Sequence, residues 1–285
     1  KKIVSKKRIL LLIFVFLVLQ ASIAGAVNTD KVDYLLEQHM KDSNLPGIAV
    51  GIIENGETVY MDTKGIDGYG ERLTETTPMF IGSVSKSLTA LAVMQLVEND
   101  QISLDRPVKK YIPYFKVANP ELSKNITVRD LLVQKSGLSD KKGVPASDFN
   151  STIEERVKDL SNIEAVTENG KEFNYFNDNY NILGLLIEEV TGQSYASYMD
   201  EHVFNPMGMV NTTADVSEIR EKEIYGYTNI FGFSKRFKER IPRYEIPCGH
   251  IVSNLQDMQK YVSFLIEPDE KILSKESIEQ MRVIS

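Results

Sequence analysis

The residues best suited to chemistry stand at the start of an expected helix, where Ser83 precedes Lys86 by three positions. In a helix this spacing puts both side chains on one face, one turn apart. A serine hydroxyl is a poor nucleophile until a base takes its proton, and a neutral lysine amine one turn away can take it. The N–H groups of the helix N-terminus favour negative charge developing near Ser83. Taken alone, so short a motif fits a capping serine beside a solvated lysine better than a catalytic pair.

A second polar pair, Tyr175 and Asn177, lies in a segment expected to be an extended loop. Residues two apart in an extended chain face the same side, so both can act on one ligand. The tyrosine hydroxyl can carry a proton, and the asparagine amide can donate or accept hydrogen bonds. Tyr175 also fits a core aromatic beside Phe173 and Phe176, so this pair by itself leaves its role open.

The elements that must position these groups follow from hydrophobic periodicity and capping residues. Two β-rich runs, Gly47–Ile53 and Glu57–Thr63, flank Asn55-Gly56, a sequence typical of a tight hairpin turn. Helices are expected at 29–41, 84–97, 127–134, 151–160, 178–190, 253–266 and 273–281. Ser253 and Gln256 form the expected capping box of the sixth of these helices. One hairpin among many helices predicts a single α+β unit.

In this order, the segments resemble the serine β-lactamase and penicillin-binding protein superfamily, in its class C-like branch. Phe80–Ser87 is similar to the Ser-x-x-Lys block of that family, and Phe173–Gly184 is similar to its Tyr-x-Asn block with the helix that follows. Lesser likenesses lie at 126–138, 205–209 and 247–258. The resemblance implies a β-lactamase/transpeptidase-like α+β fold, in which an antiparallel sheet is flanked by a helical region.

The resemblance also implies a role for each site residue. Ser83 would be the nucleophile that forms an acyl-enzyme, and Lys86 would be the activating base. Tyr175 would move the proton to or from the leaving group, and Asn177 would orient the substrate. The expected activity is that of an exported serine hydrolase acting on D-alanyl peptides or esters of the cell wall, or on β-lactams. The alternatives are a non-catalytic penicillin- or cell-wall-binding module of the same fold and an inactive truncated product.

One family motif has no counterpart in this chain. A Lys- or His-x-Gly on a strand, which supplies a cation for the substrate carboxylate and the second oxyanion N–H, should follow Tyr175. Lys135-Ser136-Gly137 and Lys141-Lys142-Gly143 fit the pattern but precede it, and His250 is not followed by x-Gly. The pair Gln134-Lys135 also departs from the His-Thr pair that the family has there. We therefore expect the C-terminal strands of the sheet to be missing.

The N-terminal residues 1–26 have the pattern of a secretory signal peptide. A basic cluster precedes the apolar run Ile9–Leu19, and the small residues Ala24-Gly25-Ala26 follow it. Eleven strongly apolar residues are few for a bilayer span, which needs about 20. Residues 9–26 as an uncleaved membrane anchor are the alternative. We expect a secreted or extracytoplasmic protein, with residues 27–285 forming a hydrolase domain that is incomplete at its C-terminus.

Composition and charge limit the partners. The 285 residues carry a net charge of −7, although five cations lie within the first eight residues, so the remainder would repel a phosphate backbone. The three histidines have no metal-ligand spacing, and one cysteine cannot form an intrachain disulfide. The sequence therefore predicts a monomer without metal or cofactor, acting on a small-molecule or peptidoglycan-type substrate, with no nucleic-acid partner.

Overall fold

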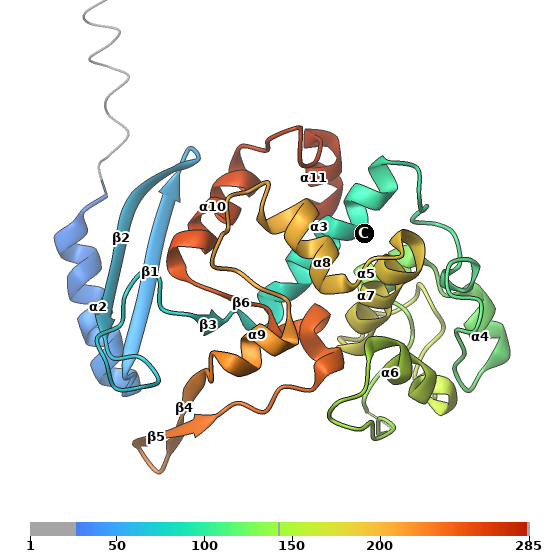
Figure 1. Ribbon diagram of the computed structural model, residues 1–285, viewed down its shortest axis with the longest axis horizontal. Coiled ribbons are helices and arrows are strands. Elements are labelled where there is room, and N and C mark those ends of the chain that lie inside the picture. Colours follow the sequence, from blue (N-terminus) through green and yellow to red (C-terminus); the bar gives the residue numbers. More distant parts are fainter. Residues whose placement is uncertain (1–26, 142, 284–285) are drawn as a thin grey trace, which may run out of the picture.

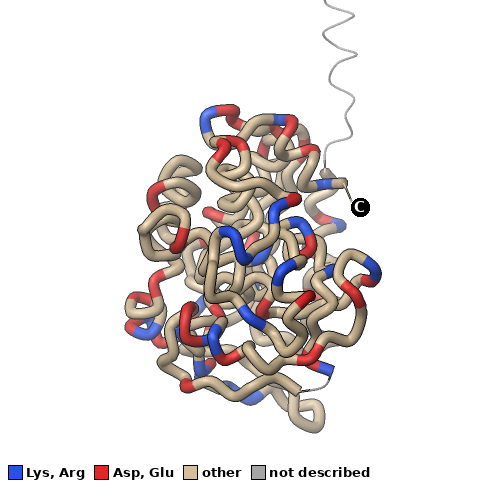
Figure 2. Tube along the Cα trace, turned by 90° about the vertical axis from the view of Figure 1, so that its right-hand side faces the viewer, with Lys and Arg blue, Asp and Glu red and all other residues tan. Residues whose placement is uncertain are grey.

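The computed structural model describes residues 27–141 and 143–283, and it has the expected mixture of helices and strands (Figure 1). The predicted signal peptide or anchor lies outside the described residues. Within the part that is described, no helix is both long and apolar enough to cross a membrane. Acidic and basic residues are interspersed over the helical side of the molecule (Figure 2).

The predicted hairpin is confirmed as β1 (Gly47–Glu54) and β2 (Glu57–Gly65), which pair antiparallel. Asn55 and Gly56 in the turn both have positive φ, the backbone that the tightest hairpin turns require. Helix α2 (Thr29–Ser43) lies on one side of this hairpin and α10 (Leu255–Ile266) on the other (Figure 1). Among the described residues, β1 pairs with no strand other than β2.

Helix α3 (Ser85–Glu98) runs through the centre of the molecule. The leucine, alanine and valine residues of this helix are distributed around its whole circumference, and most of its residues are buried. Both features are expected for a core helix. It contacts α7 (Asp178–Thr191), a π-helical turn at Ile246–His250 and α11 (Lys275–Arg282). This burial fixes the axis of the helix that carries Lys86.

Capping residues determine where the other helices begin and end. The remaining helices are α4 (Pro120–Asn125), α5 (Val128–Leu132), α6 (Ile153–Asp159), α8 (Tyr195–Met199) and α9 (Val216–Glu221). Thr127 and Asp130 cap α5 reciprocally, and Gly192 ends α7 in the left-handed conformation. The predicted cap of α10 is wrong by one residue. Asn254 caps that helix because Ser253 belongs to β6 (Val252–Ser253) and shares a hydrogen bond with Thr212.

Two further strand pairs were not predicted. β3 (Met79–Phe80) pairs with β6, and β4 (Tyr225–Ile230) pairs with β5 (Phe233–Lys238) in a second hairpin. The turn of this hairpin contains Phe231 and Gly232, both at positive φ. The described residues therefore hold three two-stranded sheets, and the short β3–β6 pair lies immediately before the predicted nucleophile.

Candidate active site

The chain reaches Ser83 through a fixed entry. Phe80 pairs with Val252 in the β3–β6 sheet, and the next residue, Ile81, donates its backbone N–H to the carbonyl of Ile251. A single 3-10 turn, Gly82–Val84, then carries Ser83 directly into α3. The predicted pair is brought together, with Lys86 Nζ 3.3 Å from Ser83 Oγ. Ser83 therefore sits where backbone N–H groups at a helix start favour negative charge.

Tyr175 and Asn177 complete this cluster from the loop before α7. Tyr175 Oη lies 2.7 Å from Ser83 Oγ, although the residues are 92 positions apart in the chain. Lys86 Nζ lies 4.8 Å from the centre of the Tyr175 ring and donates a 2.9 Å hydrogen bond to Asn177 Oδ1. The fold thus brings all four predicted site residues together.

Lys86 makes contacts with three other residues of the site. Its side chain is buried, and its Nζ contacts Ser83 Oγ, Asn177 Oδ1 and the carbonyl of Cys248, the last at 2.5 Å. These acceptors fix the lysine nitrogen against the serine, which is the geometry that proton transfer requires. The Cys248 carbonyl was not predicted, because a main-chain atom has no signature in the sequence.

A cavity of about 590 Å³ opens beside the cluster, along one face of α3. Ser83, Lys86 and Tyr180 line it together with apolar side chains from α3, α5 and α11. A substrate carbonyl that reaches Ser83 Oγ can therefore lie in a partly apolar space while polar groups surround the reacting atoms.

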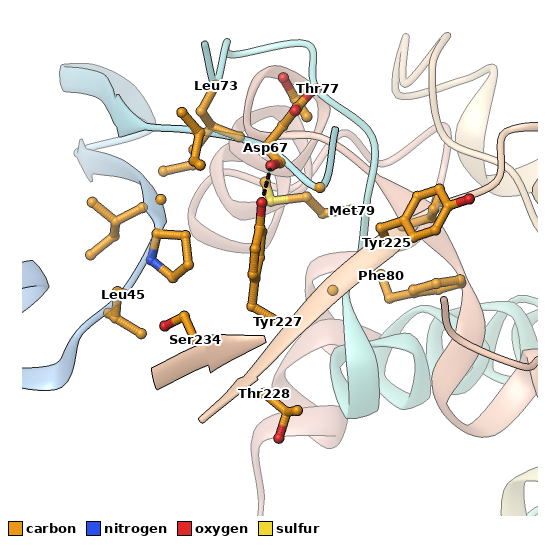
Figure 3. Close-up of a pocket in the computed structure, with 18 of the residues that line it drawn as sticks. Leu45, Asp67, Leu73, Thr77, Met79, Phe80, Tyr225, Tyr227, Thr228 and Ser234 are labelled. Carbon is orange, nitrogen blue, oxygen red and sulfur yellow. Dashed lines mark hydrogen bonds between the residues drawn. The ribbon is translucent and has the colours of Figure 1, made fainter. Parts of the chain in front are cut away.

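A second cavity, of about 380 Å³, lies where the β4–β5 hairpin meets the β1–β2 sheet (Figure 3). Leu73, Met79 and Tyr225 line it, and Tyr227 donates a 2.9 Å hydrogen bond from its hydroxyl to the carbonyl of Asp67. None of the four predicted site residues belongs to its lining.

Gln134 is a site residue that sequence reasoning missed. Its Oε1 accepts hydrogen bonds from the backbone N–H of Phe176, at 3.0 Å, and from Asn179 Nδ2, at 2.6 Å. Its own carbonyl accepts the N–H of Asn174 at 2.8 Å. Gln134 therefore holds the residues on both sides of Tyr175. The sequence marked it only as a departure from the family's His-Thr pair.

We expect Gln134→Leu to slow acylation of Ser83 about tenfold or more, because Tyr175 loses the contact that fixes its loop. The buried N–H of Phe176 also loses its acceptor, so the free energy of unfolding should fall by about 1–3 kcal/mol. Stopped-flow labelling with a fluorescent penicillin and a urea melt measure the two effects. Gln134→His, which keeps an acceptor, should retain more activity. A Leu variant that acylates at the wild-type rate would show that Gln134 does not position Tyr175.

Cys248 contributes its carbonyl to the site and keeps its thiol inert. Burial raises the pKa of the thiol to about 12, and its Sγ donates to the carbonyl of Glu245. We expect no reaction of the native protein with Ellman's reagent at pH 8, and one thiol per chain once urea unfolds it. The unfolded thiol titrates near its ordinary value, so its burial should also destabilise the fold as pH rises above about 9. Rapid modification of the native protein would contradict this assignment.

No group of His, Cys, Asp and Glu within residues 27–141 and 143–283 is arranged to hold a metal ion.

Comparison with known proteins identifies the family of the chain. The family model described as beta-lactamase matches residues 32–283. The chain belongs to the beta-lactamase family. The protein flp of Staphylococcus aureus (strain MW2) is 26% identical over 256 residues, which cover 86% of this chain and 50% of flp. This β-lactamase-family chain thus spans about half the length of the Staphylococcus aureus flp proteins.

Solved structures support the same fold for this β-lactamase-family chain. The octameric penicillin-binding protein homologue from Pyrococcus abyssi is 31% identical and superposes with a TM-score of 0.79, covering 90% of this chain and 60% of that one. FmtA from Staphylococcus aureus is 26% identical with a TM-score of 0.70, covering 86% and 68%. The predicted α+β, β-lactamase/transpeptidase-like fold is therefore confirmed, in a family whose members are generally serine hydrolases. The missing C-terminal strands and the monomeric state stay predictions.

Proposed function

We propose that this chain is an exported serine hydrolase that forms an acyl-enzyme on Ser83, with D-alanyl peptides or esters of the cell wall, or β-lactams, as substrates. One observation carries the proposal: Ser83 Oγ lies within hydrogen-bond distance of both Tyr175 Oη and Lys86 Nζ. A hydroxyl with two proton-transferring groups in contact can lose its proton as it attacks a carbonyl.

Each step then uses groups that are already in contact. Ser83 Oγ attacks the substrate carbonyl carbon and gives its proton to Lys86 Nζ, while the Ser83 N–H at the helix start stabilises the oxyanion. The bond to the leaving group breaks as Tyr175 Oη delivers a proton to it. Water then attacks the ester on Ser83 and gives its proton to Tyr175 Oη, which replaces the proton that Tyr175 had delivered. Ser83 Oγ leaves with the proton held on Lys86 Nζ, so the acid is released and all three groups are restored. Asn177 holds Lys86 through its Oδ1, and its Nδ2 is left to orient the substrate.

The choice of substrate class is supported by relatives and by the cavity. A penicillin-binding protein homologue is among the matched structures. Penicillins and D-alanyl-D-alanine peptides share a scissile amide next to a carboxylate. The cavity beside Ser83 has room for a peptide-sized acyl group.

A second candidate function is binding without turnover. No Lys- or His-x-Gly follows Tyr175 in this sequence, so the usual second oxyanion donor and the cation for a carboxylate have no counterpart in it. A chain with the nucleophile but without these groups would be acylated slowly or would only bind its ligand.

A panel of three reagents separates the candidates: a fluorescent penicillin, a D-alanyl-D-alanine peptide and a chromogenic cephalosporin. Covalent label that forms and decays, with release of D-alanine or opened lactam, supports the hydrolase. Saturable binding of the penicillin without covalent label or product, in a protein that melts cooperatively, supports the binding module.

A further inference from the structure

The β4–β5 hairpin presents an unusual outer face. In an antiparallel pair, residues opposite one another share a face, so Ile230, Phe233 and Phe237 lie on one side of the hairpin with Lys235. Phe231 follows at the turn. Phe231 is 97% exposed and Phe233 is 76% exposed. Three phenylalanines and an isoleucine in so short a hairpin form an exposed apolar surface, which in soluble proteins usually marks an interaction site.

The inner face of the same hairpin is tied to the body of the protein. Tyr227 bonds to Asp67, as Figure 3 shows, and Arg236 donates a 3.2 Å hydrogen bond to the carbonyl of Gly68. Ser234 Oγ donates a 2.7 Å hydrogen bond to the carbonyl of Asn44 at the end of α2. These contacts, with a hydrogen bond from Asn44 Nδ2 to the carbonyl of Gly232 in the turn, hold the inner face against the end of α2 and leave the side chains of the outer face exposed. The hairpin projects from the lower edge of the molecule (Figure 1).

Basic residues follow the apolar turn along the chain. Lys235, Arg236, Lys238 and Arg240 are all exposed, and Glu239 is the only acid between Phe233 and Arg240. Lys238 pairs with Glu223 and Arg240 stacks on Phe149, so Lys235 is the cation that the outer face itself presents. This segment is positive in a chain whose net charge is −7. At about 3.3 Å per strand residue, Lys235 lies roughly 7 Å behind Phe233. Lys235, on the outer face, thus lies behind the apolar tip by about the depth that separates acyl chains from lipid phosphates.

We propose that this hairpin docks on an anionic lipid membrane. Phe231 and Phe233 enter the boundary between headgroups and acyl chains, and Lys235 lies among the phosphates. A projecting turn with an aromatic tip suits a deformable bilayer, whereas a protein partner would need a matching hollow. The contact is separate from the Ser83 cluster and from residues 9–26, whose predicted membrane role is unaffected.

A tryptophan at the tip tests the proposal, because the chain has no tryptophan of its own. The full-length Phe231→Trp protein is mixed with vesicles of phosphatidylcholine and phosphatidylglycerol, with and without brominated acyl chains. We expect a blue shift of the emission by about 10 nm and quenching by the brominated lipid. The matched control is Val210→Trp, at an exposed site outside the hairpin, whose emission should stay unchanged. This comparison separates hairpin docking from tethering through residues 9–26.

Reversing the charge of the basic residue is the second test of the proposal. Adding Lys235→Glu to the Phe231→Trp protein should weaken its quenching about tenfold in lipid concentration, and pure phosphatidylcholine should give little quenching. The control Lys275→Glu, at an exposed position on α11, should change nothing. Three results would overturn the proposal: no emission shift in a folded Phe231→Trp protein, equal quenching by neutral vesicles, or a blue shift without lipid that grows with protein concentration. The last would assign the face to a second copy of the chain.

Discussion

The Ser83→Ala variant is expected to lose covalent labelling by a fluorescent penicillin, with a fall in acylation rate of at least a thousandfold. Ser83 Oγ is the only atom of the cluster that contacts both Lys86 Nζ and Tyr175 Oη. Neither of those groups is placed to form the ester in its stead, so no partial rate should remain beyond slow non-specific reaction. Gel fluorescence and intact mass, each measured over time, check the result.

This loss should not come from unfolding. The hydroxyl of Ser83 makes no capping hydrogen bond at the 3-10 turn, so Ala should change the free energy of unfolding by less than about 1 kcal/mol. Ser87→Ala is the matched control. Ser87 lines the same cavity one turn further along α3, and its hydroxyl donates to the carbonyl of Val84. Label that persists in Ser83→Ala and disappears in Ser87→Ala would remove Ser83 as the nucleophile.

Local rules were enough to predict most helices and half of the site. The caps at Thr127 and Gly192 act within a few residues, so they can be read from the sequence directly. The Ser83–Lys86 pair is similar, because a helix fixes the distance between positions three apart. The meeting of Ser83 with Tyr175 is different. It depends on packing between α3 and α7, and only the family resemblance predicted it.

The parts that were missed depend on contacts that leave no local signal. Gln134 acts on residues about forty positions away, through its amide oxygen and its main chain. The β4–β5 hairpin lacks the Asn-Gly turn that made β1–β2 recognisable, and it packs one face only. Ser253 looks like a helix cap, but strand pairing with Met79 takes precedence and moves the cap to Asn254. Tertiary pairing overrides local preference in each case.

A buried ion pair holds the start of α7, next to Asn177 of the site. Arg156 Nε and Nη2 donate to the two carboxylate oxygens of Asp178, at 2.9 and 2.7 Å, and both side chains are only 6% exposed. Arg156 also donates to the carbonyl of Pro145, and Asn181 donates to Asp178. Every charge of this pair is compensated, so removal of one partner leaves the other buried and unpaired.

We expect Asp178→Asn to lower the free energy of unfolding by about 3–5 kcal/mol, because the uncompensated guanidinium of Arg156 stays buried. The double variant Arg156→Met/Asp178→Leu should lose less than the single variant, since no charge remains to be desolvated. Asp105→Asn is the control, because its pair with Arg129 is exposed, at 74% and 44%, and should change stability by less than about 1 kcal/mol. Urea unfolding of the wild-type protein and the three variants measures these differences in the free energy of unfolding. A single variant no less stable than the control would mean that water reaches this pair, and α7 would then need another anchor to keep Asn177 against Lys86.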